Sequence, residues 1–370
     1  GRPLDLGLIG FSNTLPTLLF ALPAGVLVER WDKRKTVILF QAIMSIQAFG
    51  LAYLAYTGQI QIWHIVTLAF FYGSAVAVEV TARQAMLIEL AGRESLPSAI
   101  ALQTTAFNLG RVLGPLTAAG LISLTGSEGS VFLANGISFV FVIVGLFFAR
   151  TRFKVEGEAP KSQGMGNDFK EGLVYIRQNA VVLSAILMSA LLGFFGIPLL
   201  QQLPALARDV LRTVMDTEPI IAARTSSLYT AQGVGAVISA FMVAYLSSAN
   251  KNKMLLWGQI VFIFPVIVMG INTNMNLALV LLAFIGWGTV TQLVTMNTMI
   301  QMEVPNDLRG RVFSIYFWAL QGVAPFGSIM VGWLAQVWNV QIAIVTGGVA
   351  CLLGVIFVRL FFLQKSRSTA

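Results

Sequence analysis

Residues 254–302 read MLLWGQIVFIFPVIVMGINTNMNLALVLLAFIGWGTVTQLVTMNTMIQM and contain no Asp, Glu, Lys or Arg. About 20 apolar residues form a helix long enough to cross the hydrocarbon core of a bilayer. This stretch can supply two such helices, and the polar run Asn272-Thr273-Asn274 near its middle has the composition of a turn. The sequence therefore predicts a helical hairpin that crosses a membrane twice.

The same pattern recurs along the rest of the chain. Two more uncharged stretches, 36–78 and 312–358, are each long enough for two helices. They have polar breaks at Thr57-Gly58-Gln59 and at Trp338-Asn339. Uncharged stretches of single-span length cover 6–28, 129–149, 178–207 and 225–250, and one further span over about 98–124 carries a lone Arg111. We therefore expect an all-α membrane protein with eleven spans.

Composition excludes most other classes of protein. Of the 370 residues, 56% are hydrophobic and 11% are charged, whereas soluble domains have about 25% charged residues. This balance excludes a soluble enzyme, a nucleic-acid-binding domain and a disordered protein. The single cysteine, Cys351, excludes an intrachain disulfide, and the single histidine, His64, is too few for most zinc sites. We expect neither a metal nor a cofactor.

The basic residues predict the orientation in the membrane. Of the 24 lysines and arginines, 19 lie in one set of segments: 29–35, 83–94, 150–177, 251–253, 309–311 and the end from Arg359. Such an excess of Lys and Arg is typical of the cytoplasmic loops of membrane proteins. We therefore interpret the net charge of +8 as a sign of basic loops at the membrane surface and not of nucleic-acid binding. With the C-terminus inside, eleven spans put residue 1 outside. We therefore expect a multi-pass protein of the cytoplasmic (inner) membrane. Because the sequence starts with Gly and not Met, we expect one further helix before residue 1; a native eleven-span protein is the alternative.

The long polar stretch over 150–177 divides the chain. We expect an N-terminal helix bundle over 1–149 that lacks its first helix, a cytoplasmic linker over 150–177, and a C-terminal six-helix bundle over 178–370. Near the end of the linker, apolar residues from Phe169 to Ile176 recur at helical spacing among charges. This pattern predicts an amphipathic helix at the membrane interface.

The two halves repeat weakly. The span over 6–28 and its basic loop align with 226–246 and the basic residues after it, and Gly114-Pro115 aligns with Ala324-Pro325. Two pseudo-repeated halves indicate a transporter, whereas a bundle without a repeat would suit a channel or an intramembrane enzyme. No paired carboxylates, Ser/His set or metal ligands recur within the spans. We therefore expect no enzymatic activity.

Two glycine-containing motifs and a basic loop are candidate gating elements. The turn GVLVERWDKRK (25–35) mixes both signs of charge after a span, so its acids can pair with or cap a facing helix; positive-inside anchoring is the alternative. In GRVLGP (110–115), proline frees a backbone carbonyl and small residues four apart favour close helix contact; simple kinked packing is the alternative. The gating candidates are Gly25, Glu29, Arg30, Asp32, Arg34, Gly110, Gly114, Pro115, Arg309, Gly310 and Arg311.

Charged residues within the spans are candidates for proton coupling. Arg111 lies about ten residues, or about 15 Å, inside its span, where an arginine by default faces a cavity or a partner. A buried structural ion pair is the alternative. Glu79 also lies well within a span, where removal from water favours the neutral carboxyl that a proton carrier needs. Arg83 follows one turn later in the favourable order for an ion pair, which is the alternative role of Glu79, and Asp5 at the outer mouth is a second candidate acid.

Uncharged polar residues within the spans are candidates to line a substrate cavity. They are Asn13, Gln41, Asn108, Gln201, Gln202, Gln232, Gln292, Asn297 and Gln321. Some will instead bridge helices, which contributes roughly 0.6 kcal/mol each. Gly193, Gly196 and Pro198 predict a broken helix beside Gln201, which favours a gating role there.

Several of these motifs resemble one family. The turn over 25–35 resembles the G-x-L-x-D-R-x-G-R-R/K loop of the major facilitator superfamily, with Glu29 in place of the Asp and Asp32 near the usual Gly. The run from Ala82-Arg83-Gln84-Ala85 to Pro115 and the loop PNDLRGR (305–311) resemble the branch of the enterobactin exporter and the macrolide-efflux-type permeases. The run GRVLGPLTAA from residue 110 is similar to the antiporter motif of the superfamily's fifth helix. The resemblance implies twelve helices in two six-helix bundles, alternating access and proton-coupled export.

We therefore expect a secondary active transporter that exports a small amphipathic compound, such as a drug or a siderophore, by proton antiport. Its partners would be that compound, protons and the lipid bilayer, and we expect a monomer. An uncoupled facilitator or a lysolipid flippase on the same fold is the alternative. A neutral-polar, aromatic-rich cavity suits macrolides, siderophores and lysolipids alike.

We predict that Arg111→Ala abolishes transport and leaves the amount of protein in the membrane normal, because an intramembrane arginine is retained for function and opposes insertion. Efflux from cells is the measurement, with immunoblots of isolated membranes as the control. Normal efflux by this variant would remove Arg111 from the mechanism.

Overall fold

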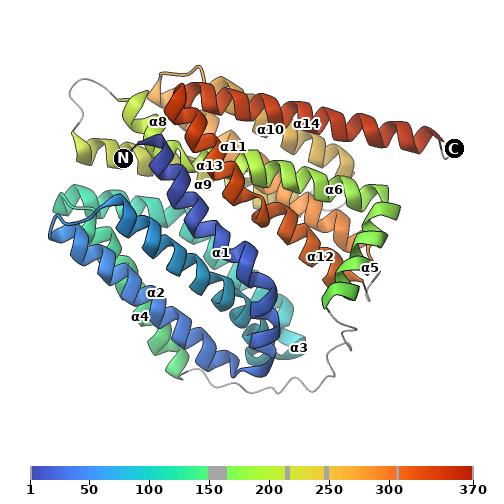
Figure 1. Cartoon of the computed structure of the whole chain (residues 1–370), viewed down its shortest axis with the longest axis horizontal. Coiled ribbons are helices and arrows are strands. Elements are labelled where there is room, and N and C mark those ends of the chain that lie inside the picture. Colours follow the sequence, from blue (N-terminus) through green and yellow to red (C-terminus); the bar gives the residue numbers. More distant parts are fainter. Residues whose placement is uncertain (1, 149–164, 213–216, 246–249, 306–307, 369–370) are drawn as a thin grey trace. The chain divides into compact units, whose positions relative to one another are not determined.

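The computed structural model describes residues 2–148, 165–212, 217–245, 250–305 and 308–368, which are helical almost throughout and contain no strand (Figure 1). They form two compact units. The first is built mainly from Leu8–Glu158 and the second mainly from Ala159–Met215 and Ser227–Ala370. Arg2–Gly7 groups with the second unit, and Asp216–Ser226 groups with the first.

Fourteen α-helices and two short π-helical segments make up the described residues. The first four are α1 (Pro3–Arg30), α2 (Lys33–Tyr56), α3 (Ile62–Thr125) and α4 (Gly129–Phe148). The others are α5 (Met165–Gln178), α6 (Ala180–Leu191), α7 (Ile197–Gln201), α8 (Leu203–Asp209), α9 (Glu218–Tyr245), α10 (Lys251–Met269), α11 (Met275–Glu303), α12 (Arg309–Phe317), α13 (Ala324–Val337) and α14 (Val340–Ser368). The π-helical segment η1 (Leu192–Gly196) joins α6 to α7, and η2 (Trp318–Gly322) lies between α12 and α13.

Nine helical segments among the described residues are long and apolar enough to cross a membrane. They are Lys33–Tyr56, Ile62–Leu87, Gly129–Phe148, Ala180–Gln201, Ile220–Val243, Lys251–Met269, Met275–Glu303, Arg311–Val337 and Val340–Phe361. The other two expected spans lie in longer helices: α1 covers 6–28, and the second half of α3 covers 98–124. In that half of α3, Leu113–Thr125 is a shorter apolar segment.

The loop expected over 83–94 is wrong, because α3 continues through it as one helix. Between residues 84 and 109 the chain has five Ala and five Leu, with Gln, Glu and Arg at five further positions. These residues are strong helix formers, so the backbone stays helical through the charged positions where hydropathy predicted a break.

Side-chain caps define the turn of the hairpin that the sequence predicts. Asn274 Oδ1 accepts hydrogen bonds from the backbone N–H groups of Asn276 (2.8 Å) and Leu277 (3.2 Å), where α11 begins. Asn272 Oδ1 in turn accepts from the N–H of Asn274 at 2.9 Å. Asn residues are favoured at this position because they satisfy N–H groups that lack a partner in the helix.

Close backbone contacts hold the helices of the first unit. A Cβ added to Gly73 of α3 would lie 2.0 Å from the carbonyl oxygen of Asn13 in α1. A Cβ on Gly136 of α4 would lie 2.6 Å from the ring of Phe49 in α2, and Ser45 Oγ donates to the Gly136 carbonyl at 3.0 Å. Helices in a membrane associate through such small residues, which permit dense packing.

Glycines also allow close backbone contacts between helices of the second unit. A Cβ on Gly235 of α9 would lie 1.7 Å from the carbonyl oxygen of Ala283 in α11, and one on Gly286 would lie 1.9 Å from that of Gln232. The start of α1 packs on α13 in the same way, since a Cβ on Gly7 would lie 2.6 Å from the carbonyl oxygen of Ser328.

Where the sequence predicts a broken helix near Gly193, the structure has the π-helical η1, which joins α6 to the short α7 without interruption. It packs against η2, because a Cβ on Gly193 would lie 1.9 Å from the carbonyl oxygen of Leu320. A Cβ on Gly327 would likewise lie 1.9 Å from the carbonyl oxygen of Phe194. Single π-helical turns of this kind are frequent at functional sites.

We predict that Gly193→Ala destabilises the protein by about 1–3 kcal/mol, because its methyl group forces η1 and η2 apart. The melting temperature of the purified protein is the measurement. Gly145→Ala in α4 is the matched control, since a Cβ there meets nothing within 4 Å. Equal melting temperatures for the two variants would contradict the tight contact between η1 and η2.

Candidate functional site

A buried carboxylate lies inside the first unit, between α2 and α3. Glu79 is 4% exposed, and its Oε1 lies 3.0 Å from Arg83 Nε, one turn later on α3. Gln41 of α2, also buried, donates from Nε2 to the same Oε1 at 3.0 Å. We call Gln41, Glu79 and Arg83 the Glu79 cluster. It brings together two residues proposed from the sequence for proton coupling and one proposed as a polar lining residue.

The amide of Gln41 is the unusual member of the Glu79 cluster. Its Oε1 is buried and accepts no hydrogen bond from the described residues. An amide carries donors on one side and an acceptor on the other. It can therefore donate to an ionised Glu79 in the observed arrangement, or accept from a protonated Glu79 after the amide turns over.

Two further candidates from the sequence lie on α3. The backbone of Asn108 and Arg111 is helical, but their side chains lie outside the described residues. A Cβ added to Gly110 or Gly114 would meet no described atom within 4 Å. Gly110, Leu113 and Gly114 are exposed among the described residues, and the close helix contact expected on this face stays a prediction.

The turn over 25–35 anchors helix ends within the first unit. Asp32 caps α2 by accepting from the N–H of Lys35 at 2.8 Å. Arg34 donates from Nε to the carbonyl of Leu146 (2.8 Å) and from Nη2 to that of Phe147 (2.6 Å), at the end of α4. A cation at a helix C-terminus satisfies carbonyls without a helical partner and opposes the helix dipole. The other gating candidates in this turn are Gly25, Glu29 and Arg30. The side chains of Glu29 and Arg30 and the surroundings of Gly25 lie outside the description.

Polar side chains also gather where α7 meets α8 in the second unit. Gln201 Oε1 accepts from Ser328 Oγ of α13 at 2.7 Å. Gln202 is fully buried, its Nε2 lies 3.5 Å from the carbonyl oxygen of Pro3, and its Oε1 has no partner among the described residues. Tyr229 of α9 donates to the carbonyl of Leu200 at 3.1 Å.

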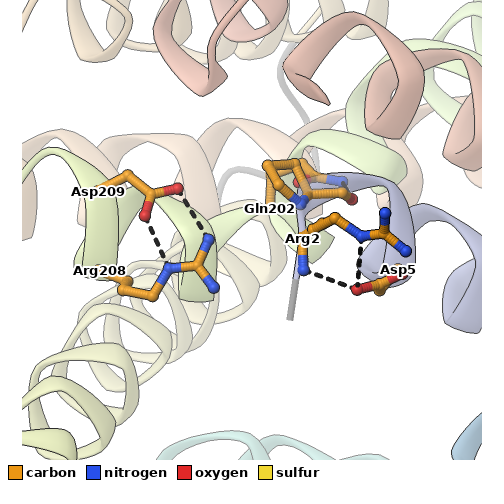
Figure 2. A network of polar contacts seen from close by, with 6 residues as sticks. Arg2, Asp5, Gln202, Arg208 and Asp209 are labelled. Atoms are coloured by element: carbon orange, nitrogen blue, oxygen red, sulfur yellow. Dashed lines mark hydrogen bonds and ion pairs between the residues drawn. The ribbon is translucent and has the colours of Figure 1, made fainter. Parts of the chain in front are cut away.

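Figure 2 shows Gln202 beside an ion pair at the start of α1. Asp5 is 6% exposed, and its Oδ2 accepts from the backbone N–H of Arg2 at 2.7 Å and lies 3.8 Å from Arg2 Nε. A second ion pair lies at the end of α8, where Arg208 Nε is 2.7 Å from Asp209 Oδ1. Asp5 is therefore a second buried carboxylate, held by its own neighbour in the sequence.

The remaining candidate lining residues differ in their contacts. Gln292 is buried and donates to the carbonyls of Gly258 (3.3 Å) and Gly288 (3.2 Å), so it bridges α10 and α11, the alternative role foreseen for such residues. Asn297 accepts from Gln301 at 2.7 Å on α11. Asn13 and Gln321 are exposed, and Gln232 is partly buried.

One polar chain in the second unit was not expected from the sequence. Arg359 of α14 donates from Nε (3.1 Å) and Nη2 (2.7 Å) to Gln259 Oε1, and Gln259 Nε2 donates to Met188 Sδ at 3.0 Å. These hydrogen bonds connect α14, α10 and α6. The sequence feature that could have indicated these contacts is Gln259, a polar residue within the uncharged stretch 254–302.

The linker helix α5 is tied to the facing ends of α11 and α12. Arg311 Nη1 lies 2.6 Å from Glu171 Oε2 on α5. Tyr175 donates to the backbone carbonyl of Glu303 at 2.9 Å, and Asn179 donates to its carboxylate at 3.0 Å. Arg309 and Gly310, expected in the loop over 305–311, form the start of α12, and the surroundings of these two residues lie outside the description.

Comparison with known families decides what this helical protein is. The family model described as transmembrane secretion effector matches residues 2–370. The chain belongs to this family of major facilitator transporters. It is therefore a multi-pass membrane transporter, and the resemblance predicted from the sequence motifs is confirmed.

Relatives and solved structures agree with this assignment. The transporter is 26% identical over 373 residues to the enterobactin exporter EntS of Shigella boydii serotype 4 (strain Sb227), covering 98% of this chain and 85% of that protein. It is 26% identical over 353 residues to EntS of Escherichia coli O139:H28 (strain E24377A / ETEC), covering 93% and 80%.

Among solved structures, the nucleoside transporter NupG matches with a TM-score of 0.73 at 12% identity, covering 98% of this chain and 91% of that one. A bacterial homologue of the human lysosomal transporter Spinster, inward-facing and occupied, matches with a TM-score of 0.71 at 15% identity, covering 99% and 90%. At these identities the likeness shows a shared fold.

We predict that Arg311→Ala loosens α5 from the transporter, because the variant loses a charge-assisted contact at 2.6 Å between α12 and α5. Hydrogen exchange of the α5 peptides should become faster, while exchange in α10 stays unchanged. Lys170→Ala, on the same helix, is the matched control. Unchanged exchange in α5 would mean that Tyr175 and Asn179 hold the helix without this pair.

Proposed function

We propose that this transporter exports a small amphipathic compound across the cytoplasmic membrane by alternating access coupled to inward proton flow. The C-terminus would lie in the cytoplasm, as the basic segments indicate. The observation that carries the proposal is the Glu79 cluster, a buried carboxylate within a candidate span that has both a cation and an amide within hydrogen-bonding distance.

The contacts of Glu79 suit a residue that binds and releases a proton. Intramembrane carboxylates are costly and mark proton relays by default. Arg83 stabilises the ionised form, and its side chain is 38% exposed, so the pair is not sealed from its surroundings. Gln41 can hydrogen-bond to either protonation state of the carboxyl group. A movement that separates Arg83 from Glu79 would therefore favour protonation, and its reversal would favour release.

The direction of transport and the kind of cargo rest on the relatives. Both EntS proteins are named as enterobactin exporters and align over most of their length with this chain. Export of a compound of mixed polar and apolar character agrees with spans whose polar residues are mainly amides, such as Gln201 and Gln202. Because the candidate acids, Glu79 inside a span and Asp5 at the outer mouth, both lie early in the chain, the proposal assigns proton binding to that half.

The test uses inverted, acid-loaded membrane vesicles that contain the transporter. A panel of macrolides, siderophores and dyes is added while a fluorescent dye follows the pH gradient. We expect one class of compound to collapse the gradient. We expect Glu79→Gln to lower that signal about tenfold or more, because the glutamine amide cannot bind and release a proton in this pH range.

Glu128→Gln is the matched control for this variant, because Glu128 is an exposed carboxylate outside the spans. Its gradient collapse should equal that of the unaltered protein. Substrate entry without any change in the gradient would overturn proton coupling in favour of a facilitator or a flippase. Full coupling in Glu79→Gln would remove Glu79 from the proton path.

A further inference from the structure

A cavity of about 300 Å³ lies among α9, α10 and α11 in the second unit. Its walls are apolar and are formed by Met242 and Val243 of α9, Met254 and Trp257 of α10, and Trp287 and Thr291 of α11. Small-molecule sites in proteins start at about this volume. None of these side chains belongs to the Glu79 cluster or to the polar groups around Gln202.

The cavity has a buried floor and an open mouth. Val243, Met254 and Thr291 are nearly inaccessible, whereas Met242 is 43% exposed and Trp257 is 61% exposed. The polar atom of the floor is already satisfied, since Thr291 Oγ1 lies 2.7 Å from Ser239 Oγ. An occupant would therefore meet no polar atom at the floor that lacks a partner, and would have to be apolar at its inner end.

The cavity lies next to close contacts between the three helices. Gly235 and Gly286 bring α9 and α11 into direct backbone contact, and Gly258 brings α10 to within 3.0 Å of the Thr291 methyl group, measured from an added Cβ. Met242 lies seven residues beyond Gly235, about two turns or 10 Å further along α9. There the flexible methionine side chains and the two tryptophans surround the space that remains.

A cationic residue lies one turn from the mouth. Lys253 is four residues before Trp257, so both lie on the same face of α10. Lys253 is exposed, and its ammonium group has no carboxylate partner among the described residues. The distribution of basic residues assigns this end of α10 to the cytoplasmic side, where anionic lipids give the membrane surface its negative charge.

We propose that this cavity binds one acyl chain of an anionic phospholipid whose phosphate group lies against Lys253. The apolar floor takes the chain, and methionine side chains adapt to its shape. The indole of Trp257 suits the boundary between chain and headgroup, where tryptophan is enriched in membrane proteins. A bound chain would wedge α9 and α10 apart at their cytoplasmic ends, so the lipid would act as a structural ligand distinct from the transported compound.

The test is photo-crosslinking of the purified transporter in phosphatidylcholine vesicles. A trace of phosphatidylglycerol with a diazirine on its acyl chain is added, and labelled peptides are mapped by mass spectrometry. We expect labelling of the α9, α10 and α11 peptides that line the cavity. Unlabelled phosphatidylglycerol should compete, and a phosphatidylcholine probe should label these peptides several-fold less.

Two variants separate the cavity from the charge. Met242→Trp fills the cavity and should remove the labelling, whereas Phe241→Trp, at a 74% exposed neighbouring position, should leave it unchanged. Lys253→Gln should reduce labelling by phosphatidylglycerol to the level of phosphatidylcholine, whereas Lys170→Gln on α5 should not. If Met242→Trp lowers the melting temperature, the surface variant Lys253→Gln still decides the outcome.

Three results would overturn the proposal. Equal labelling by the two lipid probes would mean ordinary contact with the surrounding bilayer. Unchanged labelling in a folded Met242→Trp would put the bound chain outside the cavity. Unchanged selectivity in Lys253→Gln would remove the phosphate contact.

Discussion

Water is absent from the hydrocarbon core of a membrane, and each polar group there must find its partner inside the protein. For the backbone this requirement leaves helices as the means of crossing, which accounts for a chain without strands in its described part. The same requirement governs side chains. Glu79 has Arg83 and Gln41 as neighbours, and the guanidinium of Arg359 has the amide of Gln259. Glu79 and Arg359, two charges inside described spans, therefore both have polar partners within the protein.

Apolar helices in a lipid environment gain little from hiding their side chains, so their association depends on shape. Glycines at 73, 193, 235 and 286 bring backbones together at points where any Cβ would overlap a carbonyl. The cavity beside Trp257 lies further along α9 than the crossing at Gly235, next to the contact between Ser239 of α9 and Thr291 of α11. The close glycine contacts and the apolar cavity thus both belong to the packing of α9, α10 and α11.

The sequence motifs and the structure describe different parts of the proposed mechanism. The turn over 25–35 carries the family resemblance, and its described side chains act as anchors: Asp32 caps α2 and Arg34 holds the end of α4. In the proposed alternating access, such anchors would let the helix ends move together as rigid pieces. The Glu79 cluster, by contrast, includes the amide of Gln41, which belongs to none of the sequence motifs. Gln41 contacts Glu79 because α2 packs against α3.

Local features of the sequence were enough to predict the class of the protein, the places of most spans, the turn at Asn272–Asn274 and an irregular helix near Gly193. These features depend on hydropathy summed over about 20 consecutive residues, or on turn chemistry within a few residues, and both are local properties. Contacts between polar side chains of different helices depend instead on the tertiary structure. Gln41 and Glu79 are 38 residues apart and Arg34 and Leu146 are 112 apart, so each contact depends on which helices face one another. The continuity of α3 through 83–94 was missed for a related reason, because hydropathy measures preference for lipid and does not measure the strength of a helix.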